Sequence, residues 1–166
     1  MYNKNILLLY TDMNIGGAQR HVIDLAIGLK NNNYNVFIGS SGGSLVKEIH
    51  KHGIVHKNIL KHSSNPLNII ISVKNILRFI TKKRINIIHS HHRLTNLFLF
   101  LIKKIKSNSP KMLSTAHNVF PNLHKLGFWS SKTICVSTQV EEYINKVSKS
   151  ETIVVYNSIL EVSSTI

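Results

Sequence analysis

The sequence predicts an α/β fold: a doubly wound parallel sheet of about seven strands with helices on both faces. Short apolar runs alternate along the chain with longer stretches whose apolar residues recur at the spacing of one helix face. The short runs are continuously apolar, which is typical of strands that helices cover on both sides. At 166 residues the chain is long enough for one domain with its own core.

The first sixty residues contain three predicted strands and two predicted helices. NILLLY at 5–10 predicts a strand because every residue after Asn5 is apolar or aromatic. A helix is expected at 17–31, where one face carries Ala18, Val22, Leu25, Ala26 and Leu29. YNVFIGS (34–40) predicts a strand, GSLVKEIHKHG (43–53) a short helix closed by a glycine, and IVHKNIL (54–60) a weaker strand.

The same alternation continues after residue 60. A helix is expected at 67–83, where the apolar side carries Ile69, Ile70, Val73, Ile76, Leu77 and Ile80. INIIHS (85–90) predicts a strand, LTNLFLFLIKKI (94–105) a helix and KMLSTAH (111–117) another strand. The remaining expected elements are a strand at 132–137, a helix at 138–147 and a strand at 151–157. The long irregular segment 118–131 is a candidate functional loop.

The charge balance points to an anionic partner. Lys and Arg outnumber Asp and Glu by 21 to 7, giving a net charge of +14. A nucleic acid, an anionic membrane surface and a phosphorylated substrate all fit this charge, as does a codon bias towards Lys, Asn and Ile. We expect no nucleic-acid binding, because few aromatic residues are interleaved with the basic ones. The basic clusters indicate either a solvated face or peripheral contact with an anionic membrane.

Single features of the sequence bear on localisation. One cysteine, Cys135, excludes an intrachain disulfide and suits a reducing compartment. The longest apolar run, LFLFLI at 97–102, is far shorter than the roughly 20 residues that cross a membrane. No secretory leader is recognisable at the start of the sequence. We therefore expect a cytoplasmic protein, with at most peripheral contact with the inner face of the membrane.

Ligands of open parallel sheets bind outside the carboxyl ends of the strands, so these ends are where a site is expected. The loop after the first strand, DMNIGGAQRH, contains Gly16 and Gly17 just before a helix. Glycines there let the backbone approach a phosphate at the helix N-terminus, although a plain tight turn is the alternative. Neither a dinucleotide fingerprint nor a P-loop is present.

Histidines gather at two further strand ends. HSHHRLTN places His89, His91 and His92 together, and His89 and His91 share one strand face. They could bind hydroxyl groups, cap the next helix or contribute to a metal site, but no nearby Cys, Asp or Glu completes one. His117 ends the strand KMLSTAH and is expected to face the glycine loop, where it could bind a sugar hydroxyl or a leaving phosphate; a histidine satisfied by the loop backbone is the alternative.

The acidic residues exclude several reaction classes. The chain has seven, with no D-x-D sequence for a metal–nucleotide and no pair suited to hydrolysis. It also has no G-x-S-x-G nucleophile elbow. Asp12 is the one carboxylate at a strand end near the expected cleft.

Six segments in order resemble the N-terminal domain of family-4-type (group 1) glycosyltransferases, which have the GT-B architecture of two Rossmann-like domains. They are GGAQRHVIDLAIGL, NYNVFIGSSGGSLVKEIHKHGI, INIIHSHHRLTN, STAHNVF, KTICVSTQVEEYI and ETIVVYNSI. The resemblance runs from about residue 5 to 160. One departure is Gln19, where the family commonly has Glu after Gly-Gly-Ala.

The resemblance implies retaining transfer of a hexosyl group from a nucleotide-sugar, such as a UDP- or GDP-sugar, to a lipid-linked or polysaccharide acceptor. It implies that Gly16 and Gly17 approach the donor phosphates and that His117 is the catalytic residue at the transferred sugar. It places five further residues on the acceptor side: Arg20, His91, His92, Asn96 and Asn118. No metal and no cofactor are expected, since the leaving phosphate can be stabilised electrostatically.

The resemblance also implies a missing part. The family's second domain binds the nucleotide and carries two glutamates eight positions apart, a spacing that no two glutamates have here. We expect 1–160 to be the acceptor-binding domain and 161–166 the start of an interdomain linker. This chain is then a fragment, a truncated product or a split subunit. Its donor-binding domain is absent or comes from a separate chain. Alone it should have little or no transferase activity.

Two alternatives remain open. One is a non-catalytic module that binds a sugar phosphate or anionic lipid. The other is the epimerase branch of the same architecture, against which the scarcity of carboxylates argues.

Overall fold

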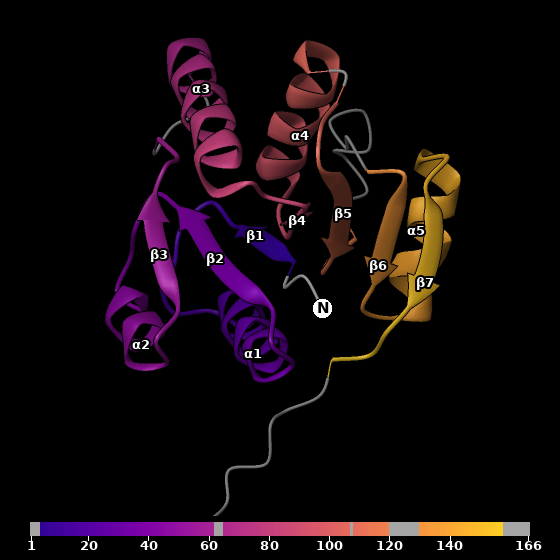
Figure 1. Cartoon of the computed structure of the whole chain (residues 1–166). Helices are drawn as coiled ribbons and strands as arrows, with labels where there is room; N and C mark the ends of the chain where they lie inside the picture. The colour runs from indigo at the N-terminus through magenta and orange to yellow at the C-terminus, as the bar shows by residue number, and fades with distance from the viewer. Residues whose placement is uncertain (1–3, 62–64, 107, 120–129, 158–166) are drawn as a thin grey trace, which may run out of the picture.

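A computed structural model describes residues 4–61, 65–106, 108–119 and 130–157 of the chain, and the structural statements below concern these residues. They form a seven-stranded sheet in which all neighbouring strands are parallel (Figure 1). The strands are β1 (Asn5–Leu9), β2 (Asn35–Ser40), β3 (Val55–Asn58), β4 (Ile87–Ser90), β5 (Lys111–Ala116), β6 (Lys132–Cys135) and β7 (Glu151–Val154). Their spatial order is β3-β2-β1-β4-β5-β6-β7, so the predicted doubly wound sheet is confirmed.

Five helices connect the strands: α1 (Gly17–Asn31), α2 (Val46–Lys51), α3 (Pro66–Lys83), α4 (Arg93–Ile105) and α5 (Thr138–Val147). The bounds of α1 and α5 coincide with the prediction. Helix α2 is shorter than the expected 43–53, because Gly43 has a φ of 142° and Gly53 a φ of 63°, neither of which a helix accommodates. Most of the irregular segment 118–131 and the predicted linker at 161–166 lie outside the described residues.

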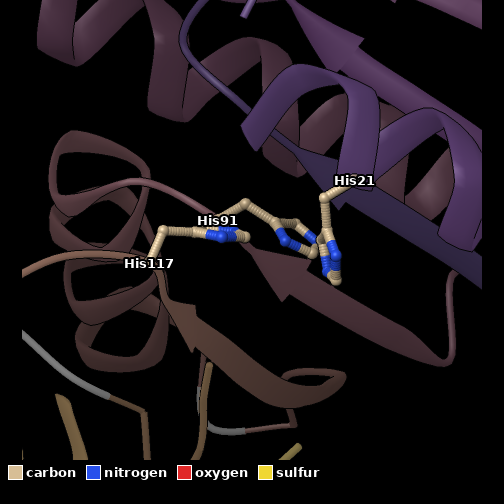
Figure 2. Close-up of side chains that lie close together, drawn as sticks. All are labelled: His21, His91 and His117. Carbon is tan, nitrogen blue, oxygen red and sulfur yellow. The ribbon is translucent and has the colours of Figure 1, made fainter. Parts of the chain in front are cut away.

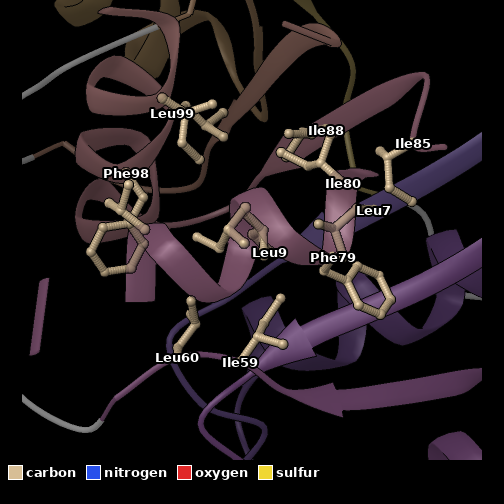
Figure 3. Packing of buried hydrophobic residues seen from close by; sticks show 13 residues of the cluster. Leu7, Leu9, Ile59, Leu60, Phe79, Ile80, Ile85, Ile88, Phe98 and Leu99 are labelled. Carbon is tan, nitrogen blue, oxygen red and sulfur yellow. The ribbon is translucent and has the colours of Figure 1, made fainter. Parts of the chain in front are cut away.

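The two faces of the sheet have separate apolar cores, as the alternation of side chains along β1 requires. Ile6 and Leu8 pack with buried residues of α1 and α2. Leu7 and Leu9 pack on the other side with buried residues of α3 and α4, among them Phe79 and Phe98 (Figure 3). A smaller cluster joins α5 to β5 and β6 through Ala116, Cys135, Val140 and Ile144. Helices therefore cover both faces of the sheet.

The loops after β1 and β2 are bonded to each other at the carboxyl edge of the sheet. Met13 N donates to Gly42 O at 2.7 Å, and Leu45 N donates to Met13 O at 2.9 Å. A Cβ on Gly43 would overlap the backbone of Met13 and lie 2.7 Å from Asn14 N. Gly43 therefore permits a close approach that holds the start of the β1–α1 loop in place.

The chain reverses its direction of travel across the sheet between β1 and β4. From β1 the strand order runs to β2 and β3 on one side, and to β4 and β5 on the other. In sheets of this kind the crevice at the reversal is the usual ligand site. Within the described residues, no helix combines the length and apolarity needed to cross a bilayer.

Candidate functional site

Three segments meet at the carboxyl ends of β1, β4 and β5, where a site was expected. They line a small pocket of about 40 Å³ through residues that include Ala18, His91, His117 and Asn118. Ala18 belongs to the first turn of α1, directly after the glycine pair. HSHH and His117 therefore meet at one pocket together with Ala18, the residue after the glycine pair, whereas Gly16 and Gly17 themselves do not line it.

Four imidazole rings gather beside this pocket. His21 of α1 lies with its ring centroid 4.9 Å from that of His117 and 5.6 Å from that of His91. The centroids of His91 and His117 are 5.8 Å apart, and His89 stacks on His91 at 4.0 Å. Figure 2 shows the rings of His21, His91 and His117 between α1 and the ends of two strands. β4 ends at Ser90, so His91 follows the strand instead of sharing a strand face with His89, although the two rings lie next to each other.

Several nitrogens of this cluster are buried without a hydrogen-bond partner among the described residues. They are Nδ1 and Nε2 of His91, whose residue is 3% exposed, and Nε2 of His117. His89 differs, because its Nε2 pairs with Thr115 Oγ1 at 2.7 Å. An unsatisfied buried polar group costs about 1–3 kcal/mol, so His91 and His117 are poised to bind a polar ligand.

Burial keeps all four histidines neutral at pH 7. Desolvation lowers the pKa of His117 to about 4 and that of His89 to about 3, and neighbouring histidines add to both effects. It also lowers the pKa of His91 well below its usual value. For His21, burial lowers the pKa more than the Asp24 carboxylate raises it. Each neutral ring offers one N–H donor and one acceptor nitrogen, which suits a hydroxyl group.

The glycine pair opens α1 without any capping side chain. Gly16 is the N-cap residue with extended backbone (φ 177°), and the first turn contains no acidic residue. An added Cβ on Gly17 would meet no atom within 4 Å, and one on Gly16 would overlap the far end of the Gln19 side chain, which is flexible enough to move away. Neither backbone conformation nor packing therefore requires glycine here. The first N–H groups of the helix are left open to an anion.

The structure places three of the five predicted acceptor-side residues at this pocket. His91 and Asn118 line the pocket. His92 also lines it, but its Nδ1 accepts from Leu94 N at 3.2 Å and forms a capping box with Thr95, so the capping interpretation holds for this histidine. Arg20 and Asn96 are not brought to this pocket.

Arg20 and Asn96 have other contacts. Arg20 is exposed and makes a two-pronged ion pair with Glu48, at 2.6 and 3.0 Å, which joins α1 to α2. Asn96 is 2% exposed, and its Oδ1 accepts from Ser114 Oγ at 2.8 Å. It lines a separate pocket of about 490 Å³, beside Lys103 and Lys104. The acceptor roles of Arg20 and Asn96 stay predictions without geometric support.

A comparison with protein-family models now bears on the site. The model described as Glycosyltransferase Family 4 matches residues 15–159, which include the glycine pair and all four histidines of the cluster. The chain belongs to glycosyltransferase family 4. No curated protein matches the sequence.

Several solved structures share the fold. A glycosyltransferase from Rickettsia africae is 25% identical with a TM-score of 0.77, and the match covers 96% of this chain and 44% of that one. A sucrose-phosphate synthase from Thermosynechococcus elongatus is 15% identical with a TM-score of 0.71, and the match covers 95% of this chain and 49% of that one. The Anabaena protein HepE, solved in complex with UDP and glucose, is 17% identical with a TM-score of 0.68. The match covers 93% of this chain and 44% of that one. This family-4 chain thus spans less than half of each of these three.

Sequence reasoning missed one member of the cluster in this family-4 domain. His21 lies within the predicted helix, directly after Arg20 and four residues after Gly17, but it was not itself singled out. The helical period could have indicated it, since one turn separates His21 from the glycine loop. Asp12, the carboxylate at the strand end, accepts from Asn14 N at 3.1 Å and so stabilises the loop.

Proposed function

We propose that this family-4 chain is the acceptor-binding half of an enzyme that transfers a hexosyl group, with retention, from a nucleotide-sugar to a lipid-linked or polysaccharide acceptor. The observation that carries the proposal is the pair Gly16–Gly17. Its glycines are required neither by backbone conformation nor by packing, yet they expose the start of α1 beside a cluster of neutral histidines. Space for a close ligand accounts for both features.

The chemistry follows from what these residues offer. The open N–H groups of α1 stabilise negative charge that develops on the leaving diphosphate. His117, the proposed catalytic residue, forms a hydrogen bond with a hydroxyl of the transferred sugar, and His91 contributes a second polar contact. Asn118 and His92 line the same pocket on the acceptor side. Electrostatic stabilisation of the leaving group needs no metal, so the donor is proposed to be a UDP- or GDP-sugar without a metal requirement.

The remaining part of the enzyme is proposed to hold the nucleotide. Donor binding would then come from a second domain, on the same chain or on a separate one. The UDP and glucose bound by the structurally similar Anabaena protein support this class of donor.

A peripheral membrane contact is proposed to be separate from the site. Lys82 and Lys83 lie in the last turn of α3, and Lys103 and Lys104 in the last turn of α4. These helix ends precede β4 and β5, at the edge of the sheet opposite the pocket. The proposed location is the cytoplasm, with anionic lipid contacting this basic edge.

A chimeric enzyme tests the proposed function. The chain is joined to the part of the Rickettsia africae glycosyltransferase that it does not cover, and transfer of radiolabelled hexose from UDP- and GDP-hexoses to lipid-linked and polysaccharide acceptors is measured. We expect transfer by the chimera. A folded chimera that binds sugar phosphate or anionic vesicles but transfers no sugar would instead support the non-catalytic binding module.

A further inference from the structure

The histidine cluster has the composition of a metal site as well as that of a sugar site. We propose that His21, His91 and His117 bind one divalent transition-metal ion of the zinc class. The three residues come from α1, the segment after β4 and the segment after β5, so the ligand set exists only in the folded chain.

The distances are close to those of a bound ion. One nitrogen from each ring can be chosen so that the three lie within 4.8 Å of one another. Zn–N bonds of about 2.0–2.1 Å in a tetrahedron bring ligand nitrogens to roughly 3.4 Å apart. The rings therefore need to close by little more than 1 Å at most. His21 is only partly buried, whereas His91 is buried with its ring centroid 4.0 Å from that of His89.

A second observation is independent of this spacing. His91 is 3% exposed, and both of its ring nitrogens lack a partner among the described residues, as does Nε2 of His117. A histidine buried for structural reasons is normally hydrogen-bonded, as His89 is to Thr115. A ligand that bonds to His91 removes this cost.

The donor set selects the kind of ion. Imidazole nitrogens suit Zn²⁺, Cu²⁺ and Ni²⁺, whereas Mg²⁺ and Ca²⁺ require oxygen ligands. Three protein ligands leave the fourth tetrahedral position for water, and the adjoining pocket of about 40 Å³ has room for one. Asp24, the carboxylate that acts on His21, adds a negative charge near the cluster.

Binding of the ion would oppose transfer. We assign both ligands to Nε2 of His117, the nitrogen buried without a partner among the described residues, so the metal-bound and sugar-bound states exclude each other. This consequence rests on the proposed function, whereas metal binding itself does not. The ion is therefore an inhibitor of the proposed reaction and not its cofactor.

Titration of the 166-residue chain, without a purification tag, tests the proposal. Calorimetry with Zn²⁺ should show one tight site per chain, and Co²⁺ should give the visible absorption of a tetrahedral complex. His21→Ala and His117→Ala should each weaken Zn²⁺ binding at least about tenfold. The matched controls His50→Ala and His52→Ala remove exposed histidines outside the cluster and should leave binding unchanged.

Circular dichroism identifies variants that fail to fold. His21, being partly buried, is the substitution expected to preserve the fold in every case. The proposal is overturned if Zn²⁺ does not bind, if Mg²⁺ binds equally well, or if folded His21→Ala retains wild-type affinity. Because no sugar is transferred in these measurements, their failure leaves the proposed function untouched.

Discussion

His117 acts in this account as a neutral hydrogen-bonding group and not as an acid. Burial brings its pKa to about 4, and Nε2 faces no partner among the described residues. A charged imidazolium beside His21 and His91 would be costly, whereas a neutral ring can meet a sugar hydroxyl without such a cost. The loss of this contact should therefore lower the rate and leave the fold intact.

The first prediction concerns this residue in the chimeric enzyme. His117→Ala should lower kcat/KM about 100-fold or more, the usual effect of removing one transition-state hydrogen bond. The melting temperature should not fall, because the side chain has an unsatisfied nitrogen. His52→Ala is the control. Transfer within threefold of wild type would remove His117 from the catalytic machinery.

The second prediction concerns acid stability. The folded pKa values of His89 (about 3) and His117 (about 4) lie below the unfolded value of 6.5, and that of His91 is also well below it. Above pH 6.5 these histidines therefore do not lower the free energy of unfolding. As the pH falls from 6.5 towards 4, only the unfolded chain binds these protons. The free energy of unfolding then falls by about 1.4 kcal/mol per pH unit for each histidine.

Urea unfolding between pH 7.5 and 5 measures this loss. The free energy of unfolding should fall steeply in the wild type. His91→Leu removes one such histidine, so below about pH 6 its slope should be smaller by up to about 1.4 kcal/mol per pH unit, with little difference above pH 7. Equal slopes in the two proteins would contradict the assignment of His91 as a buried neutral residue.

At the scale of elements, the β1–α1 loop depends on the loop beside it. The third prediction is that Gly43→Ala destabilises the chain by about 2 kcal/mol or more, since it combines a positive φ with overlap on the backbone of Met13. Gly28→Ala in α1 is the matched control, because its Cβ meets nothing within 4 Å. It should stabilise by up to about 1 kcal/mol. Thermal unfolding of both variants checks this contrast, which equal effects would contradict.

The sequence predicted the existence and order of every described strand and helix, because buried parallel strands are continuous apolar runs and α1 and α3 have clear apolar faces. The ends of elements were less predictable. β7 ends at Val154 instead of residue 157, since ladder pairing with β6 stops there. The glycine loop and HSHH were correctly placed at the carboxyl edge by the rule for parallel sheets.

The pairing of particular side chains could not be predicted. His21 reaches His117 only because α1, which packs on β1 and β2, starts beside the residues that follow β4 and β5. This placement depends on sheet register and helix position together. Arg20 precedes His21 by one residue, yet faces Glu48 on α2. A one-residue step on a helix turns the side chain by about 100°, so this difference required the structure.

For the whole molecule, we propose that the described pocket is one side of a larger site. Its 40 Å³ would hold a water molecule but not a nucleotide-sugar, and the chain spans less than half of the similar glycosyltransferase structures compared above. The fourth prediction is that the purified 166-residue chain turns over no UDP- or GDP-sugar at a rate above background. Robust turnover by this chain would show that its own residues complete the donor site.

We propose that Gly16–Gly17 leaves space for the donor phosphates. Gly17→Leu in the chimera tests it most directly, with Gly28→Leu at the other end of α1 as the control. We expect Gly17→Leu to reduce transfer at least about 100-fold while the melting temperature of the chain is retained, because nothing lies within 4 Å of the added Cβ. The control should transfer sugar at the wild-type rate. Wild-type transfer by a folded Gly17→Leu chimera would show that the glycine pair is only a turn.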